Sequence, residues 1–373
     1  MKWLAYFSNL KLLLLLTPIM LSGLITISNF GDDNQLFYKQ LIWIVISVSA
    51  FIVLSNISYD WLKTTDFVLM FYLASLALLT ITVLLGKVTK GSQAWLSFGF
   101  ASFQPSDFTK LALIILLAKY FSKRHIEIAN IRHILVSGVY ALIPFLLIML
   151  QPDLGSGLVI LAIWGGMILV SGIRLRHLLL VVGTSAAGFA LAWVFLFVPY
   201  QKNRILNFLD PLRDIRGSGY NAYQSIIAIG NGGAAGTGVG YGTQSELKYL
   251  PEYKTDFVFA AFAEEWGFVG AFTLIILFVS ILVYFIYLAY VAKSNFETLF
   301  TYGVVFWLLT HATINIGMNL GVLPVTGLPL PYMSYGGSHL LLETVAAAMV
   351  MGMARTRKSI HRSKVDIEIA GLG

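Results

Sequence analysis

Long apolar stretches separated by polar segments run along most of the chain. Each stretch is close to the ~20 residues that a helix needs to cross the hydrocarbon core of a bilayer. Hydropathy therefore predicts ten membrane-spanning helices, with boundaries good to a few residues. They lie at about 10–28, 38–57, 65–86, 105–122, 133–150, 155–172, 176–199, 266–291, 299–323 and 335–354. The expected fold is an all-α polytopic membrane protein, with residues 1–373 forming a single transmembrane domain.

The first apolar stretch also has to be compared with a signal peptide. Lys2 and Lys11 precede an apolar run over 12–27, which is the order found in signal peptides. No small-x-small cleavage site follows the run, and many more apolar stretches do. We therefore expect a first transmembrane helix that stays in the protein.

Composition and charge support the membrane class. Of the 373 residues, 58% are hydrophobic and 12% are charged, whereas a soluble domain carries about 25% charged residues. Cysteine is absent, which excludes disulfides and thiolate metal sites. The net charge is +7, but no basic segment is interleaved with aromatics as in a nucleic-acid-binding module. The excess positive charge is better explained by membrane topology.

The positions of lysine and arginine predict the orientation. With a cytoplasmic N-terminus, most basic residues fall in cytoplasmic segments, including the tail at about 355–373, while Asp32 and Asp33 fall in the first external loop. The positive-inside rule then predicts that both termini are cytoplasmic. The basic tail is interpreted as a stop-transfer flank that also attracts anionic lipid.

The segment at about 200–265 is by far the longest external connection. It carries aromatics, prolines and both signs of charge, so we expect a folded cap on the extracytoplasmic face. Within it lies the glycine-rich run at 230–242. That run lacks the lysine-serine ending of a Walker loop and the G-x-G-x-x-G spacing. A re-entrant or tightly turning segment is favoured over a phosphate cradle.

A group of charges lies where this loop returns to apolar sequence. The stretch LPEYKTDFVFAAFAEEWG contains Glu252, Lys254, Asp256, Glu264 and Glu265. Carboxylates at a membrane boundary are candidates for a functional site. Asp256 and the threonine before it also suit a helix N-cap. Capping needs one such residue and leaves the other charges unexplained.

Two further acidic motifs begin apolar stretches. In QPSDFTK, Asp107 suits a helix start and Lys110 follows at i+3, so a local ion pair is one interpretation. Lys110 also enters the membrane, where it would face a cavity or partner, such as an anionic headgroup, or snorkel to the surface. These alternatives stay open. In QPDLGS, the spacing favours a turn in which Asp153 caps a helix.

The ninth apolar stretch carries His311, Asn315 and Asn319 on one helix face. Polar side chains in membranes commonly join helices, and that interpretation is favoured over a proton path because the spacing provides no carboxylates. The following segment at 323–338 is interrupted by prolines and glycines. Such backbone is tolerated at membrane depth only where it is buried in protein or lines an aqueous cavity.

Taken in order, these motifs resemble the SEDS proteins (shape, elongation, division and sporulation). The resemblance rests on QPSDFTK, GYNAYQSIIAIG with the glycine run after it, LPEYKTDFVFA, AEEWGFVG and NIGMNLGVLPVTGLPLPYMSYGGS. It covers the chain from the first apolar stretch to the tenth. The GYNAYQS sequence and the short termini are more similar to the elongation branch than to the division branch.

The resemblance implies a ten-helix peptidoglycan glycosyltransferase of the bacterial inner membrane, with its active site on the extracytoplasmic face. Its substrates would be lipid II and glycan chains linked to undecaprenyl pyrophosphate. Its partners would be a class B penicillin-binding protein transpeptidase and the rod-complex proteins MreC and MreD. Nucleic acid is not an expected partner.

The resemblance also assigns roles to residues. Asp256 matches the essential aspartate and would be the general base for an inverting single displacement. The matched substrate-binding candidates are Lys110, Arg204, Trp95 and Asp153, joined by Glu252 and Lys254 beside the base. Two residues depart from the family pattern: His339 after SYGGS, and Glu343 in the tenth stretch. Either adjusts the site, or the two form a local pair inside the bundle.

No cofactor is required by the sequence. No compact group of histidines and carboxylates along the chain demands a metal, so a divalent cation stays unassigned.

Two other function classes compete with catalysis. A lipid II flippase fits the many spans and broken helices, but would need key charges near the membrane midplane. A scaffold for the transpeptidase leaves Asp256 and Lys110 unexplained.

Overall fold

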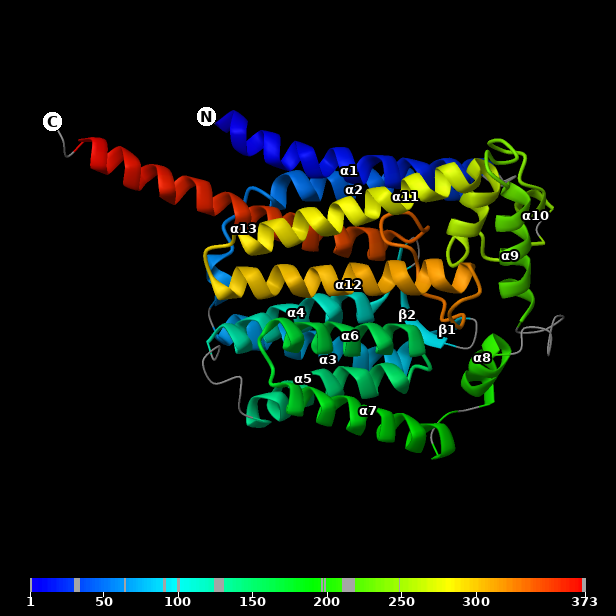
Figure 1. The fold of residues 1–373 in the computed structure, drawn as a ribbon, viewed down its shortest axis with the longest axis horizontal. Helices are drawn as coiled ribbons and strands as arrows, with labels where there is room; N and C mark the ends of the chain where they lie inside the picture. The colour runs from blue at the N-terminus through cyan, green and yellow to red at the C-terminus, as the bar shows by residue number, and fades with distance from the viewer. Residues whose placement is uncertain are drawn as a thin grey trace.

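The computed structural model describes residues 2–29, 34–63, 65–89, 92–98, 101–123, 131–195, 197, 199–209, 219–247 and 249–370. Long helices run roughly parallel and form one bundle (Figure 1). Both termini lie at the same end of this bundle, and the short elements gather at the opposite end.

Each predicted span falls on a helix. These helices are α1 (Lys2–Asn29), α2 (Asn34–Leu54), α3 (Thr65–Leu85), α4 (Pro105–Ser122), α5 (Ile131–Met149), α6 (Leu154–Val170), α7 (Leu175–Phe195), α11 (Val258–Tyr290), α12 (Asn295–Asn319) and α13 (Gly337–Ala370). Among the described residues, eight helices are long and apolar enough to cross a membrane, and α6 is a shorter apolar helix. The protein is a multi-pass membrane protein, while the count of ten spans stays a prediction.

The eighth predicted span begins too late. It was expected at residue 266, but α11 begins at Val258, and Glu264 and Glu265 are buried within it. Hydropathy assigned both acids to the loop because it takes no account of the hydrogen-bond donors that make their burial possible. The helix is broken at Gly267, whose φ of 66° and ψ of −167° are not helical.

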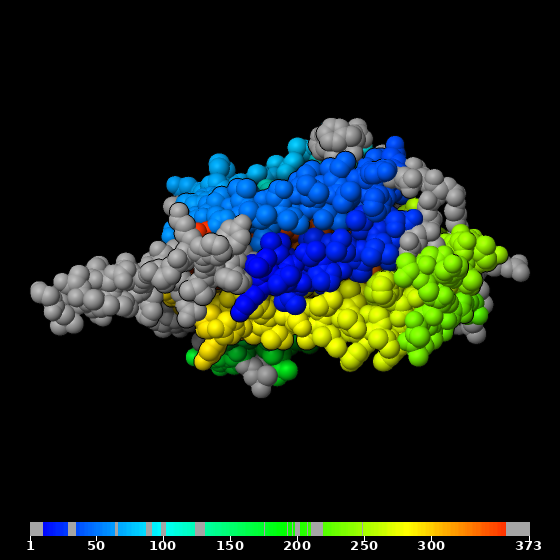
Figure 2. Space-filling view, turned by 90° about the horizontal axis from the view of Figure 1, so that it is seen from above, coloured from blue at the N-terminus to red at the C-terminus, as the bar shows by residue number. Residues whose placement is uncertain are grey.

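The segment predicted as a cap contains helices. They are α8 (Pro199–Leu209), α9 (Tyr220–Gly232) and α10 (Thr243–Glu246). All three lie at the end of the bundle away from the termini (Figure 1). Seen from above, the part of the chain that follows α8 covers this end beside α11, and α1 lies between α2 and α11 (Figure 2).

A small sheet accompanies the helices and was not predicted. Strands β1 (Lys87–Thr89), β2 (Ser92–Phe98) and β3 (Ala101–Phe103) form an antiparallel sheet in the order β1-β2-β3. A short 3-10 helix, η1 (Asp60–Lys63), precedes α3. The sheet joins α3 to α4 at the capped end (Figure 1). Its strands are too short for their alternation to be visible in so apolar a sequence.

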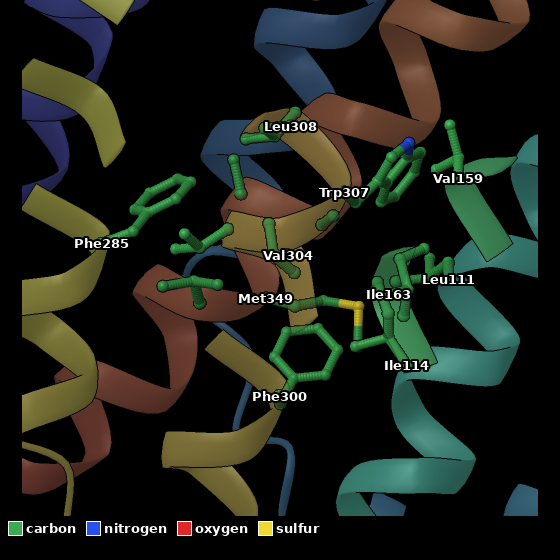
Figure 3. Close-up of a cluster of buried hydrophobic side chains, with 14 of the residues drawn as sticks. Leu111, Ile114, Val159, Ile163, Phe285, Phe300, Val304, Trp307, Leu308 and Met349 are labelled. Carbon is green, nitrogen blue, oxygen red and sulfur yellow. The ribbon is translucent and has the colours of Figure 1, made fainter. Parts of the chain in front are cut away.

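Helix α12 is central to the core. Phe300, Val304 and Trp307 of α12 pack among side chains of α4, α6, α11 and α13 (Figure 3). All three are buried. The lipid-facing sides of α2, α3 and α7 instead expose large apolar residues, as expected where hydrocarbon is the solvent. The segment that follows α12 is therefore attached to a core helix of the bundle.

The glycine-rich run packs its backbone against the break in α11. Phe268 N donates to Gly233 O at 2.9 Å, and Thr237 N donates to Glu264 O at 3.0 Å. Gly236 has a φ of +87°, and a Cβ there would overlap the backbone of Glu265. The prediction of a tightly turning segment is confirmed. Glycine permits both the positive φ and the close approach of the two backbones.

Gly236→Ala is therefore expected to destabilise the protein by about 2–4 kcal/mol, from backbone strain together with overpacking. Thermal unfolding in detergent measures the effect. Gly230→Ala is the matched control, because Gly230 lies in α9 and a Cβ there meets nothing within 4 Å. Equal melting temperatures for the two variants would contradict the packing argument.

Candidate active site

Asp256 lies in the turn that leads into α11 and is half-buried. The N-cap of α11 is Phe257, with no side-chain hydrogen bond to the helix. The capping role considered for Thr255 and Asp256 is therefore not the arrangement observed. A Cβ on Gly327 would lie 3.4 Å from Asp256 Oδ2. The carboxylate thus lies against the segment between α12 and α13 (residues 320–336), which prolines and glycines interrupt and which we call the broken segment.

Glu252 organises the backbone before Asp256. Its φ is +58°, an unusual value for a residue other than glycine. Its carbonyl accepts from Thr255 N and Phe257 N, both at 3.1 Å, and its carboxylate accepts from Thr255 Oγ1 at 3.0 Å. Lys254, in the same turn, lies with Nζ 5.2 Å from the ring centroid of Tyr253, within cation–π range.

Arg204 reaches the same broken segment from α8. Its guanidinium donates from Nη1 to Thr326 O at 3.1 Å. Thr326 is the residue before Gly327, which borders the carboxylate of Asp256. The fold therefore brings a cation from the cap and the candidate base to adjacent residues of one segment.

Asp153 caps α6, as its spacing predicted. Its Oδ1 accepts from Ser156 N at 3.0 Å, and its Oδ2 accepts from Gln104 Nε2 at 3.2 Å. A Cβ on Gly155 would lie 3.1 Å from Thr326 O. The N-terminus of α6 therefore also borders the segment that Arg204 binds.

Trp95 lies on β2, opposite Lys87 of β1, and is half-buried. The sheet is attached to the turn before α6, where Gln93 N and Ser92 Oγ donate to Gln151 O at 3.2 and 2.9 Å. Trp95 is thus at the capped end of the bundle, on a different element from Asp256.

Lys110 is inside the bundle. Its Nζ lies 2.7 Å from Asp107 Oδ1 and 3.1 Å from His311 Nε2, and its side chain is 1% exposed. The local pair suggested by the i,i+3 spacing is present, and the side chain neither snorkels to the surface nor is exposed to a cavity. In this conformation Lys110 faces protein groups, because the carboxylate offsets the cost of burying its charge.

The pair extends into a network that the sequence did not reveal. His339 Nδ1 lies 3.2 Å from Asp107 Oδ2, and His339 Nε2 lies 2.8 Å from Glu343 Oε1. The latter is a charge contact without hydrogen-bond geometry. Glu343 Oε2 also accepts from Tyr332 N at 3.0 Å. The two departures from the family pattern therefore form a pair inside the bundle.

Tyr332 connects this network to the broken segment. Its hydroxyl donates to Glu343 O at 3.2 Å. Burial, reinforced by the charge of Glu343, raises the pKa of Tyr332 well above its usual value. The phenol thus remains protonated and keeps its donor.

His311, His339 and Glu343 also form a possible cation cluster, since their ligand atoms lie within 4.8 Å of one another. The Lys110 ammonium lies 3.1 Å from Nε2 of His311. Its positive charge opposes a divalent cation there unless the lysine moves. The donor set therefore suits an internal ion-pair network better than a metal. No signal along the chain joined His311 to His339 and Glu343, because it comes from α12 and they come from α13.

Glu264 and Glu265 hold the cap. Glu264 Oε1 accepts from Gln244 N at 2.9 Å, and its Oε2 accepts from Ser245 Oγ at 3.1 Å. Glu265 Oε1 accepts from Gly240 N at 2.7 Å. These acids satisfy backbone and hydroxyl donors of the loop, and so belong to its architecture.

Comparisons with known proteins identify the family of the chain. The family model described as "Cell cycle protein" (FtsW, RodA, SpoVE) matches residues 2–359. The chain is 33% identical over 356 residues to "Peptidoglycan glycosyltransferase MrdB" of Escherichia coli (strain K12), covering 94% of each chain. It is 36% identical over 356 residues to "Stage V sporulation protein E" of Bacillus subtilis (strain 168), covering 92% of this chain and 96% of the relative.

Solved structures give the same result. A chain of the structure described as "Structural coordination of polymerization and crosslinking by a peptidoglycan synthase complex" aligns with a TM-score of 0.81 and 32% identity, covering 93% of this chain and 97% of that one. The Thermus thermophilus rod shape determining protein RodA aligns with a TM-score of 0.70 and 29% identity, covering 93% and 96%. The chain belongs to the FtsW, RodA and SpoVE family of membrane proteins.

Proposed function

We propose that the protein is a peptidoglycan glycosyltransferase that polymerises lipid II into β-1,4 glycan strands during cell elongation. The observation that carries the proposal is the half-buried carboxylate of Asp256 at the capped end of the bundle, bordered by the segment that Arg204 binds. The names of the relatives, which include a peptidoglycan glycosyltransferase and a synthase complex, support the same activity.

The reaction requires a base and a stabilised leaving group. Asp256 would accept the proton of the GlcNAc 4-hydroxyl as this oxygen attacks the anomeric carbon of the second substrate. An α-linked donor that gives a β-linked product is inverted, so one displacement and one base suffice. Negative charge develops on the departing pyrophosphate, where a cation is most useful. Arg204, which reaches from α8 to the segment beside Asp256, is the cation assigned this role.

The remaining candidates have supporting roles in the proposal. Trp95 offers an aromatic face for a sugar. Asp153 fixes the start of α6, which borders the segment that Arg204 binds, and Glu252 and Lys254 shape and charge the turn that carries the base. Lys110 is assigned to the donor side through its positive charge; direct contact with pyrophosphate requires its pair with Asp107 to open.

Replacing Lys110 tests that assignment. Lys110→Met, which keeps most of the side-chain volume, is expected to raise the KM for lipid II several-fold by removing a positive charge, and also to lower stability because Asp107 loses its buried partner. Turnover is measured at limiting and saturating lipid II with equal amounts of folded protein. Wild-type turnover at limiting lipid II would count against a donor-side role.

The proposed setting follows from the same activity. The protein would reside in the bacterial inner membrane, with both termini cytoplasmic and the capped end extracytoplasmic. It would act with a class B penicillin-binding protein transpeptidase and with MreC and MreD. Membrane lipids would surround the apolar faces of the bundle.

One experiment separates polymerisation from lipid II transport. Purified protein with its transpeptidase partner is given fluorescent lipid II, and glycan products are resolved on a gel. The same preparation in liposomes is tested for lipid II translocation. Polymer without translocation supports the proposed enzyme, whereas translocation without polymer supports a flippase.

A further inference from the structure

Three consecutive backbone carbonyls before α11 accept hydrogen bonds from distant parts of the chain. Lys254 O accepts from Tyr335 N at 2.8 Å. Thr255 O accepts from Ser334 Oγ at 2.6 Å. The third carbonyl is that of Asp256 itself, and its donors are two asparagine side chains of α12.

Both asparagines are fully buried and converge on one oxygen. Asn315 Nδ2 donates to Asp256 O at 2.9 Å, and Asn319 Nδ2 donates to the same carbonyl at 3.1 Å. The side-chain oxygen of Asn319 binds the start of α11, since its Oδ1 accepts from Ala260 N at 3.1 Å. One side chain thus bridges the peptide of the candidate base and the first turn of α11.

These bonds replace the backbone N–H donors that the carbonyls would find within a helix. The carbonyl of Phe257 accepts from Ala261 N of α11 at 3.2 Å. Buried carbonyls in the turn before it need other partners. The donors come from α12 and from the segment after it, and the side chains of Asn315, Asn319 and Ser334 are buried. The carbonyl of Asp256 is therefore held by buried side chains of α12, while Phe257 N of the same peptide donates to Glu252 O in the turn.

We propose that Asn315, Asn319 and Ser334 are positioning residues that fix the backbone of Asp256, and through it the direction of its carboxylate. The inference rests on the proposed role of Asp256 as general base. A base has to be within hydrogen-bond reach of the hydroxyl it deprotonates. Displacing a reacting group by about 1 Å costs on the order of a hundredfold in rate.

The alternative is that these bonds only satisfy buried carbonyls and stabilise the fold. The two roles differ in what they change. Loss of a purely stabilising bond lowers the melting temperature and leaves the turnover of the folded protein intact. Loss of a positioning bond lowers kcat of the folded protein with little effect on the KM for lipid II.

The test compares four variants in the lipid II polymerisation assay with the transpeptidase partner present. Asn319→Asp keeps the oxygen that accepts from Ala260 N but removes the amide that donates to Asp256 O. Ser334→Ala removes the donor to Thr255 O and also the oxygen that accepts from Leu330 N at 2.8 Å, and Ser334→Thr restores a hydroxyl. Ser137→Ala is the matched control, because Ser137 is a buried serine in α5 that accepts from Trp164 Nε1 at 3.2 Å, away from the site.

We expect kcat to fall about tenfold to a hundredfold in Asn319→Asp and Ser334→Ala, with the KM for lipid II within about threefold of wild type. Ser334→Thr should recover most of the loss, and Ser137→Ala should keep the wild-type kcat after correction for folded protein. Melting temperatures are measured in the same detergent.

Two outcomes would overturn the inference. One is a wild-type kcat in both Asn319→Asp and Ser334→Ala. The other is a fall in kcat that is matched by Ser137→Ala at an equal loss of melting temperature. Asp256→Asn is assayed alongside them. Full activity of that variant would reject the proposed base, a result distinct from failure of the positioning residues with the base intact.

Discussion

Asp256→Asn is expected to abolish glycan polymerisation while leaving the bundle folded. The amide has nearly the same shape as the carboxylate but cannot accept the proton of the attacking hydroxyl. A positioned general base contributes about 10²–10⁴-fold to a rate, so polymer should fall below detection on a gel of fluorescent lipid II products. The half-buried position of Asp256 makes a large loss of stability unexpected.

The control for this variant is Asp66→Asn. Asp66 is an exposed aspartate in the first turn of α3, at the end of the bundle away from the cap, so its substitution should leave polymer formation unchanged. Melting temperatures of both variants establish that they are folded. Undiminished polymer from Asp256→Asn would rule out Asp256 as the base.

Asp107→Ala is expected to destabilise the protein by about 3–5 kcal/mol, because removing one member of a buried ion pair leaves the other uncompensated. Asp107 and Lys110 are each 1% exposed and lie 2.7 Å apart. His339 Nδ1 also loses its contact at 3.2 Å. Thermal unfolding in detergent measures the loss, which should be accompanied by low yield of folded protein.

A second variant distinguishes the ion pair from simple loss of packing. Asp107→Ala combined with Lys110→Met removes both charges and keeps most of the lysine volume. Because replacement of a whole buried pair by apolar groups is often neutral, the double variant should recover a large part of the lost stability. Equal melting temperatures for the single and double variants would show that the buried charge of Lys110 is not the cause.

Several features of the fold could be predicted from local sequence. Helix-length apolar stretches gave the positions of the long helices, since a stretch of that length requires a membrane or a core to cover it. The i,i+3 spacing of Asp107 and Lys110 indicated their ion pair, because residues three apart share a helix face. The glycine run indicated a turning segment, and Asp153 a cap, for equally local reasons.

The candidate site was predicted less completely. Asp256 was identified because a charge at a loop boundary is conspicuous in an apolar chain, and the family resemblance gave it a role. The start of α11 was placed too late, since Glu264 and Glu265 look like loop residues until Gln244 N and Gly240 N of the cap are brought to them. Their burial depends on partners that hydropathy does not include.

By itself, the sequence determined that this is a multi-pass helical membrane protein, and which residues could carry charge into it. Only the tertiary structure decided which of those residues meet. His311 contacts Lys110 across 201 positions of the chain, His339 contacts Asp107 across 232, and Asn319 reaches the carbonyl of Asp256 across 63. Hydropathy and helical period act within one segment, whereas contacts between helices depend on how whole elements pack around α12. The environment of the base is therefore a property of that packing.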